Sequence, residues 1–380
     1  MRVLVVTSMY PSKEAPGYAV YMAEQVRSLR AAGIDVDLFQ FNPRRTRFNY
    51  AVSLPQLVRK LRSERYDVLH THHTYTLILV DVARTVARSR VPLVLTNHEG
   101  EASDTTQRTR TWHPMSLLRN SLLLKKMVTR RADFPIFVSQ RLSDVIYPHG
   151  EFEVIPCGVD VETFRRLDRA QCRDQLRLPL DAFLVFFPGN PKSMAKRIAL
   201  ADATYEVIRH RHPRALMLTG GNIPPESMPL HYNAADVVLQ TSYYEGSPTV
   251  VKEALACEIP LVSTDVGDTQ AVVQGVPYCF VCRDDPSELA GAVLRCEGQR
   301  ATGGRDRLLD LGLSLEQTAL KLIRVYHRVT NSQMGTLSRI ETGHPGGPTP
   351  SPSVHRTDQT IGQLKCCSSA ICASVRPILY

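Results

Sequence analysis

Short apolar segments alternate with longer amphipathic segments along most of this chain, and this alternation constrains its fold more than any other feature. In the first part we expect strands at residues 2–7, 35–41, 67–71 and 91–96. The intervening segments carry apolar residues at helical spacing, which predicts helices at 18–33, 54–64 and 76–88. Such alternation is typical of a parallel, doubly wound α/β sheet.

The same alternation starts again near residue 182. Further strands are expected at 183–187, 215–219, 236–240 and 260–264, and further helices at 197–211, 228–234 and from about 286. The chain is therefore predicted to contain two Rossmann-like domains in tandem. Because ligands of such sheets bind at the carboxyl ends of the strands, two facing domains would enclose a substrate cleft.

Changes in composition suggest the domain boundaries. Turn-rich residues 154–160 are a candidate hinge, so we assign 1–155 to a first domain and 156–313 to a second. Helical spacing of apolar residues predicts a closing helix at 314–329. Residues 330–380 are rich in Ser, Thr, Pro and Gly without any period, which predicts a disordered tail.

Two glutamates, Glu245 and Glu253, stand eight positions apart around the expected start of a helix. Ser247 is a suitable helix cap, which would place Glu245 in the approach loop and Glu253 inside the helix. The amides of Thr249 and Val250 would then be free to bind an anion. Carboxylates beside an anion site suit a ligand with both hydroxyls and phosphate, such as a nucleotide sugar.

Composition and charge restrict the class of protein. The 380 residues suffice for two domains with cores, and the net charge of +9 permits nucleic acid, anionic membrane surfaces or phosphorylated ligands as partners. No zinc-finger, RNP or basic-zipper pattern accompanies the charge, so nucleic acid is not expected. The N-terminus is expected to be a strand rather than a signal peptide, and nine scattered cysteines indicate a reducing cytoplasm.

A metal site is not expected. Cys279 and Cys282 lie on an expected short strand without a second Cys or His pair. His70, His72 and His73 lack a carboxylate or cysteine partner at suitable spacing, so a structural role is preferred for all three.

Several motifs, in order and spacing, make residues 1–329 resemble glycosyltransferase family 4, retaining enzymes of the GT-B fold. The matching segments are 8–12 with Gly17, 67–72, 96–98, 155–160 with Phe164, 245–256 and 259–267. The resemblance implies that the first domain is the acceptor side and the second binds the nucleotide-sugar donor. The compact second domain is most similar to the branch that builds cell-surface polysaccharides, such as teichuronic acid or capsule glycosyltransferases.

The resemblance implies roles for the residues that match. Glu245 would bind sugar hydroxyls of the donor, and Glu253 the ribose hydroxyls of the nucleotide. The amides of Thr249 and Val250 would meet the diphosphate, and Lys196 would neutralise it as it leaves. Breaking an anomeric C–O bond builds up charge on the departing phosphate, which cations and helix amides stabilise.

Further residues complete the site that the resemblance implies. His98 ends a strand and would face the cleft near the reacting sugar. Gly17, Gly189 and Ser247 are expected among the donor-binding residues. Enzymes of this fold generally need no metal ion, so we expect no cofactor besides the nucleotide-diphosphate sugar that serves as co-substrate.

Two of the chain's departures from the family pattern affect the expected anion site. Asn190 follows Gly189 where the family usually has Arg, so a second positive charge must come from Lys192 or Arg197. Pro248 has no amide, which removes one backbone donor beside the expected anion site.

The basic, amphipathic segment 105–131 contains the only tryptophan, Trp112. Such a segment can lie on anionic lipid, which would suit a lipid-linked acceptor and a cytoplasmic protein peripheral to the inner face of the cell membrane. Alternatively, it forms a core helix whose leucines and Met127 pack inward beneath a solvated basic face.

The leading hypothesis is a retaining hexosyltransferase that moves a sugar from a nucleotide-diphosphate sugar to a glycan or lipid-linked acceptor in cell-surface polysaccharide biosynthesis. Two alternatives remain: a sugar-nucleotide epimerase of the same architecture, and a non-catalytic nucleotide-sugar-binding protein. Nucleotide diphosphate released only when acceptor is present would favour transfer.

Overall fold

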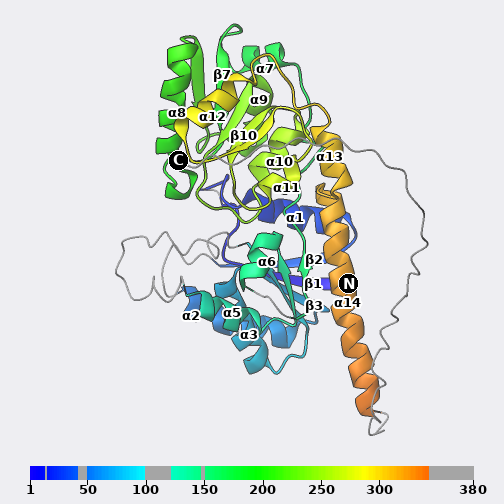
Figure 1. Ribbon diagram of the computed structural model, residues 1–380. Helices are drawn as coiled ribbons and strands as arrows, with labels where there is room; N and C mark the ends of the chain where they lie inside the picture. The colour runs from blue at the N-terminus through cyan, green and yellow to red at the C-terminus, as the bar shows by residue number, and fades with distance from the viewer. Residues whose placement is uncertain (13–14, 42–48, 99–120, 147–149, 342–380) are drawn as a thin grey trace, which may run out of the picture. The chain divides into compact units, whose positions relative to one another are not determined.

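The computed structural model describes residues 1–12, 15–41, 49–98, 121–146 and 150–341. Within these residues, parallel strands of the first part form a sheet in the order β2-β1-β3-β4-β5-β6 (Figure 1). Its strands are β1 (Arg2–Thr7), β2 (Asp35–Gln40), β3 (Val68–His72), β4 (Leu93–Asn97), β5 (Phe134–Phe137) and β6 (Glu153–Val154). Its helices are α1 (Val20–Ala31), α2 (Asn49–Ser63), α3 (Thr74–Ala87), α5 (Leu122–Thr129) and α6 (Gln140–Ile146).

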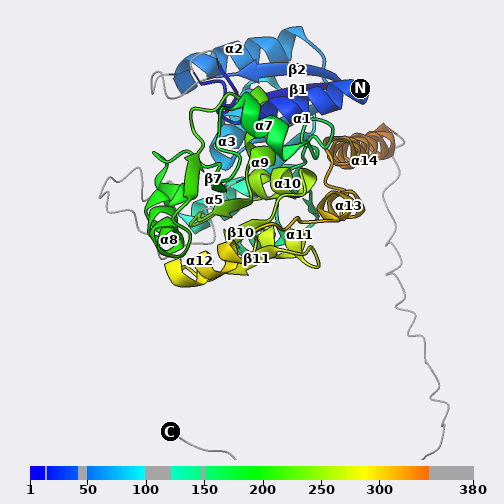
Figure 2. The same ribbon diagram turned by 90° about the horizontal axis from the view of Figure 1, so that it is seen from above.

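The second part forms a second parallel sheet, in the order β11-β10-β9-β7-β8. Its strands are β7 (Phe183–Phe187), β8 (Ala215–Thr219), β9 (Val237–Gln240), β10 (Leu261–Thr264) and β11 (Cys279–Cys282). Its helices are α7 (Arg169–Gln175), α8 (Ile198–Arg211), α9 (Met228–Ala234), α10 (Thr249–Ala256), α11 (Thr269–Val273), α12 (Pro286–Leu294) and α13 (Gly304–Asp310). Helices α8 and α12 lie side by side in both ribbon views (Figures 1 and 2).

Each sheet is covered by helices on both faces. Val3 and Val5 of β1 pack in a core with residues of α1, whereas Leu4 and Val6 pack in another core with residues of α2 and α3. Successive side chains of a strand point to opposite faces, so an uninterrupted apolar strand needs cover on both. The predicted fold, two doubly wound Rossmann-like domains, is confirmed.

The closing helix is longer than predicted. Helix α14 (Leu315–Glu341) starts where expected, and its residues Ala319, Leu322 and Tyr326 pack into the core that contains Val3 and Val5. The chain thus returns from the second sheet to the first. The helix continues beyond residue 329, into the start of the segment predicted to be disordered, and residues 342–380 lie outside the described part.

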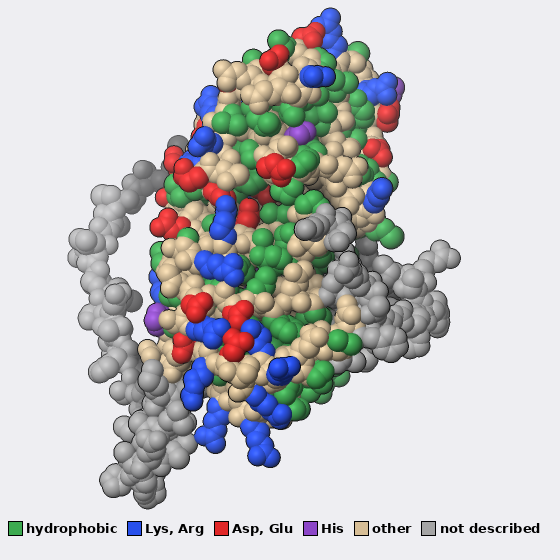
Figure 3. Space-filling model, turned by 180° about the vertical axis from the view of Figure 1, so that it is seen from behind, with side chains coloured by type: hydrophobic (Ala, Val, Ile, Leu, Met, Phe, Trp, Pro, Cys, Tyr) green, Lys and Arg blue, Asp and Glu red, His purple; other side chains and the backbone are tan. Residues whose placement is uncertain are grey.

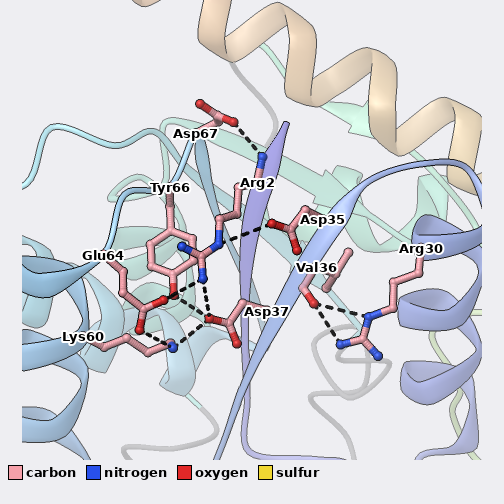
Figure 4. A network of polar contacts seen from close by, with 9 residues as sticks. All are labelled: Arg2, Arg30, Asp35, Val36, Asp37, Lys60, Glu64, Tyr66 and Asp67. Atoms are coloured by element: carbon pink, nitrogen blue, oxygen red, sulfur yellow. Dashed lines mark hydrogen bonds and ion pairs between the residues drawn. The ribbon is translucent and has the colours of Figure 1, made fainter.

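A network of charged side chains ties the end of α2 to the edge of the first sheet (Figure 4). Arg2 contacts Glu64 at 2.6 Å, and Lys60 contacts Asp37 at 2.7 Å. The hydroxyl of Tyr66 donates to Asp37 at 2.6 Å. Because Lys60 is engaged in this network, it is not available to a ligand at the outer surface of α2.

The basic segment 105–131 lies partly outside the described residues, including Trp112 and the leucines at 117 and 118. Its described end forms α5, where Met127 is 58% exposed and Leu123 is 69% exposed. The expectation that Met127 packs inward is therefore wrong, because α5 buries Lys125 and Val128 instead. No helix in the described part of the chain is long and apolar enough to cross a membrane.

Candidate active site

The second sheet places the predicted donor residues at its topological switch point. The chain leaves β7 toward β8 on one side and later continues in β9 on the other, so the loops after β7 and β9 share one carboxyl edge. Lys196 lies in the first of these loops, in the short 3₁₀ helix η2 (Met194–Lys196), and Glu245 lies in the second.

Lys196 and Glu245 are in direct contact across these two loops. The Nζ of Lys196 donates to Oε1 of Glu245, and the hydroxyl of Ser242 donates to the same oxygen at 2.8 Å. Within the described part, no hydrogen bond takes the other carboxylate oxygen of Glu245. The pair therefore joins a cation to a carboxylate that still has an oxygen for a hydroxyl ligand.

Glu253 lies in α10, eight residues after Glu245, and is more enclosed than Glu245 is. The hydroxyl of Tyr232 donates to Oε2 of Glu253 at 2.5 Å. Burial raises the pKa of Glu253, while hydrogen bonds from Tyr232 and Thr249 and the charge of Lys196 oppose the rise. The charge of Lys196, which contacts Glu245, thus also acts on Glu253.

The start of α10 differs from the prediction for Ser247. The helix begins at Thr249 and its cap is Pro248, so Thr249 and Val250 are the first residues whose amides lack a partner inside the helix. The hydroxyl of Ser247 makes no cap bond, because it accepts from the amide of Cys157 at 3.1 Å and donates to Asp268 at 2.8 Å. The predicted capping role of Ser247 is therefore wrong.

The loop after β7 holds the residues that depart from the family pattern. A β-carbon on Gly189 would lie 3.2 Å from Cβ of Lys196, so the glycine lets this loop approach the lysine closely. Asn190 accepts through Oδ1 from the amide of Lys192 at 2.9 Å and thereby shapes its own loop. The side chain of Lys192 is exposed and makes no ion pair within the described residues.

Arg197, the other candidate for the second positive charge, is held by the protein. Its guanidinium pairs with Asp284 and lies 4.0 Å from the ring centroid of Tyr243. Its backbone adopts a left-handed conformation, φ 53°, at the start of α8. The ammonium group of Lys192 is therefore more available to a phosphate than the guanidinium of Arg197. Arg197 would first have to break its ion pair with Asp284.

In the first domain, His98 follows β4 and its ring is engaged on both sides. Its Nε2 lies 3.0 Å from Nδ1 of His72, and its Nδ1 lies 3.7 Å from the sulfur of Cys157. Burial lowers the pKa of both imidazoles well below the usual value, so both are neutral. Direct hydrogen bonding of the His98 ring to a sugar would require exchanging one of these partners.

Both ring nitrogens of the neighbouring His70 have partners inside the protein, which indicates a structural role. Its ring nitrogens contact the hydroxyl of Tyr326 at 2.6 Å and that of Thr96 at 2.8 Å, and burial lowers its pKa to about 3. His73 contacts the hydroxyl of Tyr21 through Nε2 at 3.4 Å. Among the described residues, no group of three or more His, Cys, Asp or Glu side chains is placed to hold a metal ion.

The donor loop of the second domain touches the first domain near His98. Arg141 of α6 pairs with Asp265 after β10 at 2.8 Å, and the sulfur of Cys157, whose amide binds Ser247, lies 3.7 Å from the His98 ring. Gly17, by contrast, is exposed and has no atom within 4 Å of a β-carbon placed on it. The structure thus brings Glu245 and Gly189 into contact range of Lys196, whereas Gly17 borders open space.

Sequence reasoning missed two residues at this site, Tyr232 and Glu24. Tyr232 lies in α9, a predicted helix, but only the fold brings it to Glu253. Glu24 is on α1, where burial, aided by the charge of Glu253, raises its pKa to about 7. An acidic residue on the otherwise half-buried face of α1 was the only signal that the sequence offered.

Two facing doubly wound domains, with a lysine–carboxylate pair and a helix N-terminus at the switch point of the second, define the GT-B class. Sucrose-phosphate synthase from Thermosynechococcus elongatus is structurally similar, with a TM-score of 0.71 and 20% identity over 87% of this chain and 100% of that one. Anabaena HepE, solved in complex with UDP-glucose, has a TM-score of 0.62 and 17% identity over 86% and 100%.

Family models match both halves of the chain. Residues 15–163 match Glycosyltransferase Family 4, and residues 183–297 match Glycosyl transferases group 1. The chain is thus a glycosyltransferase with a Family 4 domain followed by a group 1 domain.

Individual relatives share only about a quarter of their residues with this chain. A protein named as a teichuronic acid biosynthesis glycosyltransferase, TuaC from Bacillus subtilis (strain 168), is 23% identical, covering 79% of this chain and 90% of its own. The D-inositol 3-phosphate glycosyltransferase of Acidothermus cellulolyticus is 26% identical, covering 80% of each.

Proposed function

We propose that this glycosyltransferase is a retaining hexosyltransferase that uses a nucleotide-diphosphate sugar and acts in cell-surface polysaccharide biosynthesis. The observation that carries the proposal is the contact between Lys196 and Glu245 beside the open N-terminus of α10. A cation, a carboxylate and free amides within one site match a ligand that has a diphosphate next to a sugar. UDP and UDP-glucose in the HepE structures, and the name of TuaC, support the donor class and the pathway.

In this proposal each residue of the site binds a different part of the nucleotide-sugar donor. Glu245 binds sugar hydroxyls through its unengaged oxygen, and Glu253 binds the ribose hydroxyls. The amides of Thr249 and Val250 bind the diphosphate, and Lys196 neutralises it as the anomeric bond breaks. Lys192 supplies the second positive charge where the family usually has Arg. No metal ion takes part, so chelator should leave the rate of transfer unchanged.

The experiment is a transfer assay with a panel of nucleotide-diphosphate sugars, first ranked by thermal shift, because a ligand that binds only the folded state raises its stability. Release of nucleotide diphosphate that depends on added acceptor supports transfer. Release without any acceptor, or isomerisation of the sugar, would instead support hydrolysis or epimerisation.

Two variants and a control test the assigned roles. Glu245→Ala is expected to reduce transfer by at least about a hundredfold while the protein stays folded, since positioned charges of this kind contribute that much. Glu253→Ala should mainly weaken binding of the nucleotide diphosphate. Glu297→Ala, an exposed carboxylate of the same domain, is the matched control. Undiminished turnover of folded Glu245→Ala would sink the assignment.

We further propose that the acceptor is a glycan or lipid-linked glycan reached from an anionic membrane surface. The support comes from one surface of the first domain, named here the α2–α3–α5 face. It comprises Val52, Arg59 and Arg62 of α2, Ile78, Val82, Val86 and Arg88 on and after α3, and Leu123, Lys126, Met127 and Arg130 on and after α5.

The composition of the α2–α3–α5 face fits a bilayer. Ile78, Val82 and Val86 recur every four residues on α3 and are all exposed, so they form an outward apolar stripe rather than a core stripe. Arg59 and Lys126 beside it make no side-chain hydrogen bond or ion pair within the described residues. Figure 3, seen from behind, shows Lys, Arg and hydrophobic side chains at the end of the molecule that contains the first sheet, with Asp and Glu among them. Lipid acyl chains would contact the apolar stripe, and lipid phosphates would contact Arg59 and Lys126.

A further inference from the structure

His72 and His98 form a buried imidazole pair at the carboxyl edge of the first sheet. His72 is the last residue of β3, and His98 follows the adjacent strand β4, whose Thr96 is in register with His72. The two rings are nearly parallel, with an interplanar angle of 28°, and Nδ1 of His72 lies 3.0 Å from Nε2 of His98. This distance is that of a hydrogen bond, so one ring donates and the other accepts.

Both rings are neutral, which leaves a single proton in the bond between them. Burial is the main cause of the lowered pKa of each ring, and the nearby imidazole of His70, 4.3 Å from His72 between centroids, adds to it. A neutral imidazole carries its proton on only one nitrogen. The choice of donor in this bond therefore fixes which nitrogen of each ring is protonated.

Two arrangements are possible, and they differ at Nε2 of His72. If His98 donated, His72 would have to carry its own proton on Nε2. That atom is buried and has no partner within the described part of the chain. An orphaned buried N–H is rarer in proteins than an orphaned acceptor, so the arrangement with His72 as donor costs less.

The second nitrogen of His98 completes the assignment. With His72 donating from Nδ1, His98 accepts at Nε2 and carries its proton on Nδ1, which faces the sulfur of Cys157 at 3.7 Å. Thiol sulfur is a weak acceptor, so this N–H has a partner that a ligand oxygen can replace at little cost. The Cys157 amide in turn binds Ser247 of the donor loop, so the sulfur sits where the two domains meet.

We propose that His72 is a positioning residue that holds His98 as the Nδ1–H tautomer, so that His98 presents a hydrogen-bond donor that can exchange from the Cys157 sulfur to an oxygen of the sugar ligand. The tautomer follows from the geometry of this chain alone. Its use toward the sugar rests on the proposed transfer function.

The direct test is ¹⁵N NMR of the full chain labelled at its histidines, using long-range couplings that distinguish Nδ1–H from Nε2–H rings. The His98 signals are assigned by their loss in His98→Gln. We expect wild-type His98 to be an Nδ1–H ring and His72 likewise. An Nε2–H ring at His98 overturns the proposal, whether or not the protein transfers sugar.

Two variants of His72 give a matched pair. The amide of His72→Asn can donate from about the position of Nδ1, so His98 should remain Nδ1–H. His72→Phe keeps the ring volume but donates nothing, so His98 should move toward the Nε2–H form that free imidazole side chains favour. If His98 stays fully Nδ1–H in a folded His72→Phe protein, His72 does not set the tautomer.

Kinetics separate positioning from stability. His72→Phe should lower kcat about five- to tenfold, as expected for one displaced hydrogen bond, with His72→Asn restoring most of it. The dissociation constant of the nucleotide diphosphate should not change, because that ligand is proposed to bind the other domain. Equal kcat for folded His72→Phe and wild type would refute the use of His98 toward the sugar while leaving the donor proposal intact.

Discussion

A β-carbon on Gly246 would lie 2.6 Å from the carbonyl oxygen of His98 and 2.8 Å from Cγ2 of Val138. Gly246 follows Glu245 in the donor loop, whereas His98 and Val138 belong to the first domain. The absence of a side chain at this position therefore determines how closely the donor loop approaches the first domain. Glycine is needed here for close approach, not for an unusual backbone angle.

The first prediction concerns this approach. Gly246→Ala should force the donor loop away from His98, because a carbonyl oxygen cannot yield as a flexible side chain can. We expect a loss of about 1–3 kcal/mol in the free energy of unfolding and at least a tenfold loss of turnover. Urea unfolding and the transfer assay measure the two effects.

Gly291→Ala is the control for that variant. Gly291 lies inside α12 with no atom within 4 Å of an added β-carbon, so the same substitution should stabilise the protein by about 0.5–1 kcal/mol. If Gly246→Ala behaves like Gly291→Ala in both assays, the contact with His98 has no role in closure.

The strands and the long helices were predictable because their patterns are local. Strand β7 has five consecutive buried residues, and the apolar residues of α8 after it recur at helical spacing. The same alternation of strand and helix is found in both domains. Short elements such as α11 and β6 were not predicted. They are too short to show a period, and they form because neighbouring elements pair with them.

The site was predictable where residues act within one loop or helix, and not where the fold joins distant segments. Glu245 and Glu253 were found from their spacing around one helix. Ser247 was misjudged, because its hydroxyl accepts from the amide of Cys157, 90 residues earlier in the chain, a partner that local capping rules cannot include. His72 was assigned a structural role, and only the adjacency of β3 and β4 revealed its bond to His98.

The second prediction concerns the hydrogen bond from Tyr232 to Glu253. Tyr232→Phe removes a donor at 2.5 Å from a buried carboxylate, so the pKa of Glu253 should rise further and its hold on the ribose should weaken. We expect the dissociation constant of the nucleotide diphosphate to increase about five- to tenfold, measured by calorimetry. In Tyr205→Phe, which loses a hydroxyl bond to the carbonyl of Ala215 far from the site, affinity should be unchanged.

The third prediction is a pH dependence of stability due to Glu24. Burial and the charges of Glu253 and Asp160 raise its pKa from 4.5 to about 7, while Arg27 opposes the rise. The folded protein therefore binds this proton more tightly than the unfolded chain does. The free energy of unfolding should fall as the pH rises from about 5 to 7, by at most about 3 kcal/mol, and the loss should then level off.

Glu24→Gln should remove this fall, since its amide does not ionise. Denaturant unfolding at pH 5, 6, 7 and 8 compares the wild type with Glu24→Gln, and with Glu206→Gln as an exposed control on α8. Parallel curves for wild type and Glu24→Gln would show that Glu24 ionises freely in the folded protein.

The last prediction tests the α2–α3–α5 face. The double variant Leu123→Ser/Met127→Ser should reduce binding to vesicles of phosphatidylglycerol and phosphatidylcholine at least about tenfold, because these side chains supply apolar area that a bilayer would bury. Reversing the charges of Lys126 and Arg130 to Glu should abolish the part of binding that added salt weakens. Leu180→Ser is the control, since Leu180 is 65% exposed but lies in the second domain. Wild-type protein that fails to float with anionic vesicles at low salt would reject the membrane surface, yet it would leave donor binding by the second domain untouched.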